Sequence, residues 1–140
     1  MPETDTIPVS ASIASTGLGL RYVGNWVYAY SGQVTASTSK QTVIETTTGS
    51  GIIVCRIQFN GFNHENVPGD GANGMATISF NDINVSILRS ESGQEDAPYS
   101  VYEKFVIPPF TKVKVTVDAD STSSSFFGSV NLVGRVYGAE

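Results

Sequence analysis

The sequence predicts an all-β protein, an antiparallel jelly-roll β-sandwich of about eight strands with an extended N-terminal arm. Short runs in which apolar and polar residues alternate recur along the chain, separated by turn-forming residues, and no segment shows the spacing of an amphipathic helix. Pro108 and Pro109 cannot donate to a strand ladder, so pairing must stop there and resume at Phe110. Strands joined by such a rigid offset usually lie in different sheets. A tight hairpin, a long loop, this proline offset and a long closing strand, in that order, favour a jelly roll.

The two runs beside the proline pair show the alternation most clearly. In the second run Thr111, Val113, Val115 and Val117 point one way, whereas the lysines and threonine between them point the other. In the first run Val101, Phe105 and Ile107 share a face with Glu103. Each run therefore predicts a strand with one buried and one solvent-exposed face.

Residues 1–24 are predicted to form the arm and residues 25–140 the jelly-roll domain. The arm contains prolines, glycines, serines and threonines, with apolar residues spaced too irregularly for a helix. A plain disordered tail is one alternative. The other is that the arm packs on its own domain or on a neighbour, and the apolar residues that would make this contact are Ile7, Val9, Ile13, Leu18, Leu20 and Val23.

Trp26, Tyr28 and Tyr30 alternate with small apolar residues, so they share one face of a strand. Three interpretations stay open for this face. It is core, or a subunit or partner interface in which Trp and Tyr act as anchors, or a platform on which sugars stack.

The remaining elements follow in order. Gly51–Phe59 is the most apolar strand and is expected to be central. Because Ile52 and Val54 lie opposite Ile53 and Cys55, this strand is expected to start buried on both faces. Asn81-Asp82 is expected to close a two-residue hairpin. The other predicted strands are 33–37, 41–47, 75–80, 83–88 and 126–137, and the predicted loops are 60–74, 89–100 and 118–125.

Composition excludes several classes of partner. The net charge is −5 and the 8 basic residues are scattered, which argues against nucleic acid and against an anionic membrane. No run approaches the ~20 apolar residues of a membrane span. The N-terminus lacks the basic and apolar regions of a signal peptide, so assembly in a cytoplasm is expected.

The residue types that carry catalysis or bind metals are sparse. Cys55 lies in an apolar strand, where a buried and inert thiol is expected. His64 is the single histidine and lies in a predicted glycine-rich loop, without a serine elbow or further histidines to build a triad or a metal site. Asp118 and Asp120 lack the spacing of a calcium loop. We therefore expect no enzyme activity, no cofactor and no metal.

At residues 105–117 (FVIPPFTKVKVTV) and 131–138 (NLVGRVYG) the chain resembles small jelly-roll proteins of tailed-bacteriophage virions. These are capsid decoration (cement) proteins and the heads of fibres. The resemblance implies a structural protein that binds the major capsid protein on the outer surface of the shell as a homotrimer, and stabilises it. It carries over no individual functional residue. The alternative function is a carbohydrate-binding or receptor-binding module at a fibre tip, which would use the aromatic face.

Overall fold

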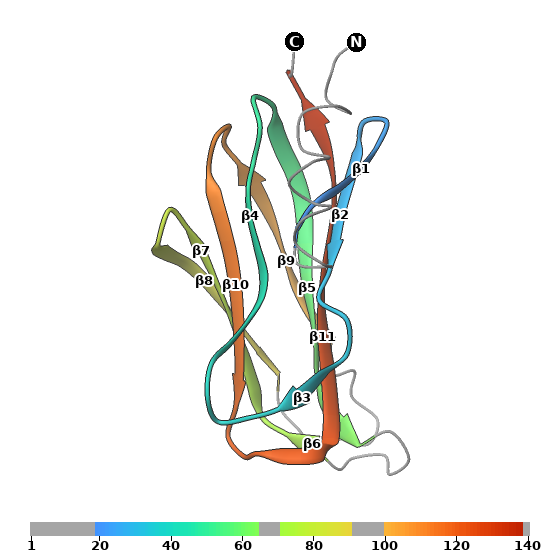
Figure 1. Cartoon of the computed structure of the whole chain (residues 1–140), viewed down its shortest axis with the longest axis vertical. Helices are drawn as coiled ribbons and strands as arrows, with labels where there is room; N and C mark the ends of the chain where they lie inside the picture. Colours follow the sequence, from blue (N-terminus) through green and yellow to red (C-terminus); the bar gives the residue numbers. More distant parts are fainter. Residues whose placement is uncertain (1–18, 65–70, 91–99, 139–140) are drawn as a thin grey trace.

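The computed structural model describes residues 19–64, 71–90 and 100–138, and these form a β-sandwich (Figure 1). The strands are β1 Arg21–Val23, β2 Trp26–Tyr30, β3 Val34–Ala36, β4 Gln41–Thr47, β5 Ile52–His64, β6 Gly71–Ala72, β7 Gly74–Phe80, β8 Ile83–Ser90, β9 Ser100–Ile107, β10 Lys112–Ala119 and β11 Ser123–Tyr137.

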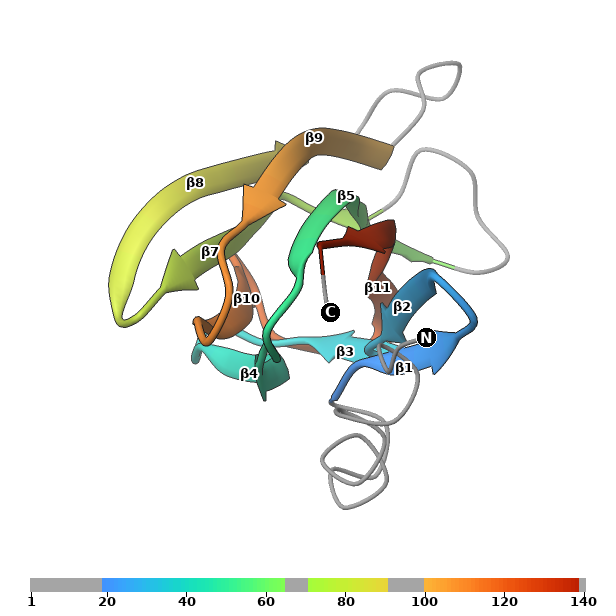
Figure 2. The same cartoon turned by 90° about the horizontal axis from the view of Figure 1, so that it is seen from above.

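Within these residues the strands form a larger sheet of seven strands and a smaller sheet of four. The larger sheet has the order β1-β2-β11-β5-β6, with β9 also on β5 and β3 also on β11. The order in the smaller sheet is β4-β10-β7-β8. Every pairing is antiparallel. Figure 2 shows the two sheets facing one another when the molecule is seen from above.

The pairing of the eight longer strands defines the topology. The first pairs with the last (β2 with β11), the second with the seventh (β4 with β10), the third with the sixth (β5 with β9) and the fourth with the fifth (β7 with β8). Such nested pairs arise when one long hairpin is rolled into two sheets, which is a jelly roll. The predicted fold is confirmed.

The proline pair turns the chain from one sheet to the other, as predicted. β9 lies in the larger sheet and β10 in the smaller. The hydroxyl of Thr48 donates to the carbonyl of Pro108 at 2.9 Å and accepts from the backbone N–H of Thr111 at 2.9 Å. Phe110, between them, has a φ of 54° and donates its N–H to the carbonyl of Gly49 at 2.9 Å. These bonds replace the ladder partners that the prolines cannot supply.

The hairpin between β7 and β8 also has the predicted geometry. Asn81 and Asp82 have φ values of 54° and 68°, the two left-handed conformations that a type I′ turn needs. Asn81 further exchanges hydrogen bonds with the backbone of Lys112, which ties the turn to β10.

The core lies between the sheets and is built from alternate residues. Val113, Val115 and Val117 of β10 are buried, as the alternation predicts, and belong to the same hydrophobic core as Ile57 and Phe59 of β5. Fully burying one such side chain is worth about 1.5–3 kcal/mol. Since the described part of the chain has no helix to cover a sheet, the opposite faces of both sheets lie at the surface.

Two expectations for β5 are wrong. First, its start is not buried on both faces, because Ile52 and Val54 are 42% and 43% exposed on the side away from the smaller sheet. An apolar residue on each side of a strand gives the same sequence pattern whether the second face is covered by this chain or left bare.

Second, β5 does not end at Phe59 but continues to His64, where a loop was expected, and β6 pairs with its end. Phe62 is fully buried and meets the ring of Phe59 edge-on, with centroids 5.7 Å apart. This tertiary packing holds the strand extended through a stretch whose glycines and asparagines locally favour turns. Strands also take up the ends of two other predicted loops, since β8 continues to Ser90, β9 begins at Ser100 and β10 continues to Ala119.

The described part of the segment expected to be an arm belongs to the folded domain. Leu20 is buried in the core, and β1 forms a hairpin with β2. Positions 1–18, which include Ile7, Val9, Ile13 and Leu18, lie outside the described residues.

A candidate docking face on the larger sheet

The three aromatic residues of β2 point away from the core. Trp26, Tyr28 and Tyr30 are 50%, 44% and 54% exposed, whereas Val27 and Ala29 between them are fully buried. The core interpretation of these aromatic residues is therefore wrong, and the interface and the sugar platform are the two that remain. Leu20 was expected to contact a neighbour, but it is buried in the core of its own domain.

Strand register extends this aromatic stripe across the sheet. Tyr28 is paired with Val133 of β11, which is paired on its other side with Arg56 of β5 and, beyond it, Lys104 of β9. Paired residues point to the same side of a sheet, so the whole row faces outward. We call this surface the outer face. Its large apolar members, each 41–63% exposed, are Val23, Trp26, Tyr28, Tyr30, Ile52, Val54, Tyr102, Val106, Val133 and Tyr137.

The charges on the outer face have one sign. Arg21, Arg56, Lys104 and Arg135 lie on it, and among the described residues it carries no carboxylate. These are half of the 8 basic residues of a chain whose net charge is −5. The described acidic residues lie elsewhere. Glu45, Asp82, Asp118 and Asp120 belong to the smaller sheet or its connections, and Glu103 accepts a hydrogen bond from Ser86 of β8.

Two of the cations lie over aromatic rings of the same face. The guanidinium carbon of Arg135 is 4.7 Å from the ring centroid of Trp26, and that of Arg56 is 5.2 Å from the centroid of Tyr102. At exposed sites such contacts are worth about 0.5–1 kcal/mol. They hold the guanidinium planes against the rings, while the N–H edges stay available for a carboxylate from outside.

A shallow groove of about 360 Å³ opens at the Tyr30 end of the outer face. It lies where β11 runs beside the last part of β5. Its lining residues are Tyr30, Gln33, Asn60, Gly61, Asn63, Phe127, Gly128 and Ser129. The groove combines aromatic rings with side-chain amides and has no charged lining residue.

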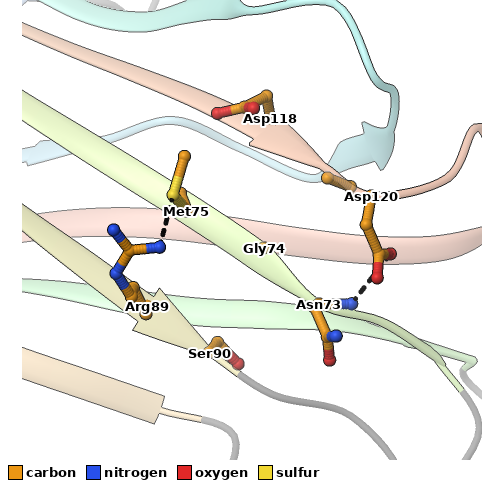
Figure 3. A pocket seen from close by; sticks show the side chains of 8 residues that line it. Asn73, Gly74, Met75, Arg89, Ser90, Asp118 and Asp120 are labelled. Carbon is orange, nitrogen blue, oxygen red and sulfur yellow. Dashed lines mark hydrogen bonds between the residues drawn. The ribbon is translucent and has the colours of Figure 1, made fainter.

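A second pocket, of about 310 Å³, lies at the ends of β7, β8 and β10 (Figure 3). Asp120 there accepts a hydrogen bond from the backbone N–H of Asn73 at 3.2 Å, and its carboxylate and that of Asp118 point apart. Arg89, also in the lining, contacts the sulfur of Met75. Across the described residues no group of three or more His, Cys, Asp or Glu side chains is placed to share a metal ion. The two aspartates alone do not form a calcium site.

Cys55 and His64 are packed among other side chains of the sandwich. Burial raises the pKa of Cys55 to about 12, so its thiol stays protonated and weakly nucleophilic near neutral pH. His64 is half-buried at the end of β5, with its ring 6.3 Å from that of Phe126 and edge-on to it. Neither residue lies in the groove or on the apolar part of the outer face. In the described segments no helix has the length and apolarity to cross a membrane.

Comparisons with known proteins give similarities of overall shape only. No family model and no curated protein sequence matches it. Among solved structures it is similar to a pilus protein of Bacillus endospore appendages, with a TM-score of 0.47 and 9% identity over 81% of this chain and 90% of that one. It is also similar to the VP2 subviral particle of infectious bursal disease virus, with a TM-score of 0.44 and 13% identity over 82% of this chain but 34% of that one. A family 35 carbohydrate-binding module from an environmental isolate gives a TM-score of 0.33 and 17% identity over 88% and 75%. These similarities are too low to inform function, and the jelly-roll assignment rests on the strand pairing.

Proposed function

We propose that this chain is a non-catalytic virion protein, a decoration (cement) protein that binds the major capsid protein on the outside of a tailed-bacteriophage shell as a homotrimer. The single observation that supports this proposal most is the outer face. It is a continuous apolar and cationic surface on a chain whose fold needs none of those side chains for its core.

The size of the outer face suits a stable protein contact. Its five aromatic residues are each about half exposed, so at roughly 200 Å² per side chain they offer about 500 Å² between them. The five aliphatic residues add to this area. A standard interface buries about 800 Å² on each partner, and monomers rarely leave so much contiguous apolar surface bare.

The charges on the outer face select the partner. Two copies pressed together by this face would bring four cations against four cations, which is unfavourable at a desolvated contact. A surface that presents carboxylates between apolar patches would instead pair with Arg56 and Lys104 in particular. The isolated placement of the cations among apolar side chains, in a chain of net charge −5, favours a protein over a phosphate backbone.

The homotrimer is proposed to form through the segment ahead of β1. Leu20 is anchored in the core and is followed by β1, which lies at an edge of the larger sheet, so the segment joins the domain beside that edge. Ile7, Val9, Ile13 and Leu18 would then bury their side chains on a neighbouring copy. Repeated contacts of this kind let a shell protein act through avidity, without an active site.

Location is tested by immunogold electron microscopy of native particles. Label spread over the outside of the shells is expected. Label confined to fibre tips, or its absence from particles, would overturn the decoration role.

Use of the outer face is tested by co-sedimentation with shells that lack the protein. Lys104→Glu reverses a charge on the face, and Lys40→Glu makes the same change on an exposed residue between β3 and β4. Only Lys104→Glu is expected to weaken binding, and added salt should weaken the wild type. Equal losses would indicate a general effect of net charge, and binding that is unchanged in Lys104→Glu would exclude this face.

A further inference from the structure

The groove at the Tyr30 end of the outer face arises from an irregularity in strand pairing. Along β11 and β5, Ser129 is opposite Asn60 but Phe127 is opposite Asn63, so the register slips between the two pairs. The groove, of about 360 Å³, lies at this register shift. That volume lies at the lower end of the roughly 300–1,000 Å³ typical of small-molecule sites.

We infer that this groove binds a neutral pyranose sugar. A pyranose ring has an apolar C–H face that can lie on an aromatic ring, and hydroxyl groups that donate and accept around its edge. The groove supplies both counterparts, the rings of Tyr30 and Phe127 and the amides of Gln33, Asn60 and Asn63. No charged side chain lines it, so a charged ligand would lose hydration without a compensating partner.

The polar groups of the groove are held in place before any ligand arrives. The Oδ1 of Asn60 accepts hydrogen bonds from Nε2 of Gln58 at 2.9 Å and from Oγ of Ser100 at 2.6 Å, and its Nδ2 donates to Oγ of Ser129 at 3.0 Å. The Ser129 hydroxyl, which accepts this bond, keeps its own proton for a ligand oxygen. Such preorganisation lowers the ordering cost of binding.

Asn63 brings to the groove a buried acceptor without a partner. Its Nδ2 donates to the carbonyl of Gly61 at 2.9 Å, but its Oδ1 is buried and has no hydrogen-bond partner. Buried polar atoms are normally paired. A ligand hydroxyl donating to this amide, after a small rotation of the side chain, would satisfy the oxygen. The unpaired acceptor therefore favours a ligand that is rich in hydroxyl groups.

The groove shares Tyr30 with the outer face but contains neither Trp26 nor any of the four cations, so Lys104→Glu and Trp26→Ala test docking without touching the sugar site. Binding is tested on the full-length protein by heteronuclear NMR titration with methyl β-galactopyranoside, methyl α-glucopyranoside and N-acetylglucosamine, with glucuronate as a charged comparator. Millimolar binding of a neutral sugar is expected, with the largest shifts at the backbone amides of residues 30–33, 60–63 and 127–129.

Matched variants locate the contact. Tyr30→Ala is expected to weaken binding by about tenfold, which corresponds to 1.4 kcal/mol, and Asn63→Ala to weaken it as well. Tyr28→Ala, two residues earlier on the same strand and face but outside the groove, is expected to leave affinity unchanged. The inference is overturned if no neutral sugar shifts the groove amides, if glucuronate alone does so, or if Tyr28→Ala weakens binding as much as Tyr30→Ala.

Discussion

Replacing Trp26 by alanine separates docking from folding. The side chain is 50% exposed on the outer face, and its ring lies beneath the guanidinium of Arg135. The neighbouring core residues Val27 and Ala29 point to the other side of β2, so the substitution leaves no cavity in the core. The substitution removes the cation–π contact, worth about 0.5–1 kcal/mol, and the packing of the buried half of the ring on its own sheet, which by area is worth up to about 3 kcal/mol.

The cost to docking comes from the exposed half of the ring. About half of a Trp side chain of roughly 250 Å² is available to a partner, which is about 125 Å². At ~25 cal/mol per Å² this corresponds to about 3 kcal/mol as an upper value. Binding to shells should therefore weaken by up to roughly two orders of magnitude.

The assay is co-sedimentation with shells over a range of protein concentrations, with thermal unfolding measured in parallel. Phe110→Ala is the matched control, because Phe110 is 70% exposed but lies at the proline corner between β9 and β10 and is not one of the outer-face residues. It should bind as the wild type does. A Trp26→Ala protein that binds within about twofold of the wild type, or a Phe110→Ala protein that is equally impaired, would refute the assignment of the face.

Three further predictions concern the fold and the assembly. A Cβ at Gly134 would lie 2.3 Å from the carbonyl oxygen of Val54, so Gly134→Ala should lower the free energy of unfolding by about 1–3 kcal/mol in urea melts, and a neutral effect would contradict the close packing of β11 on β5. Burial raises the pKa of Cys55 from 9.0 to about 12 and that of Tyr22 from 10.0 to about 12, so the folded state holds these protons more tightly and stability should fall as pH rises from about 9 toward 12. Cys55→Ala should remove up to about 1.4 kcal/mol per pH unit from that slope, and an unchanged slope would be inconsistent with the buried thiol. Light scattering should give a trimer mass for the full chain and a monomer for a chain lacking residues 1–18, whereas a monomer mass for both would count against the proposed role of the arm.

Local signals in the sequence predicted most of the fold. The alternation in residues 111–117, the proline pair and the Asn81-Asp82 turn each act over a few residues, so their meaning does not depend on the rest of the chain. Together they set which strands change sheet and where hairpins close. The extension of β5 to His64 was not predictable in this way, because it depends on the packing of Phe62 in a core formed by distant strands.

In the candidate sites, too, local features were predictable from the sequence, whereas features that depend on distant strands were not. The exposure of Trp26, Tyr28 and Tyr30 on one face was one of the alternatives that the spacing of β2 left open. Its continuation through Val54, Val106 and Val133 requires the register of strands far apart in the chain. The groove is harder still to foresee, since Asn60 and Phe127 become neighbours only where β5 and β11 slip in register.

The most direct test of the docking face is lysine acetylation of the free and the shell-bound protein, followed by mass spectrometry. Lys104 lies on the outer face, whereas Lys112 and Lys114 lie on β10 in the smaller sheet. Binding through the outer face should protect Lys104 from acetylation and leave Lys112 and Lys114 as reactive as in the free protein. Protection of Lys112 and Lys114 with Lys104 unchanged would show that the opposite sheet meets the shell, and would contradict the proposal.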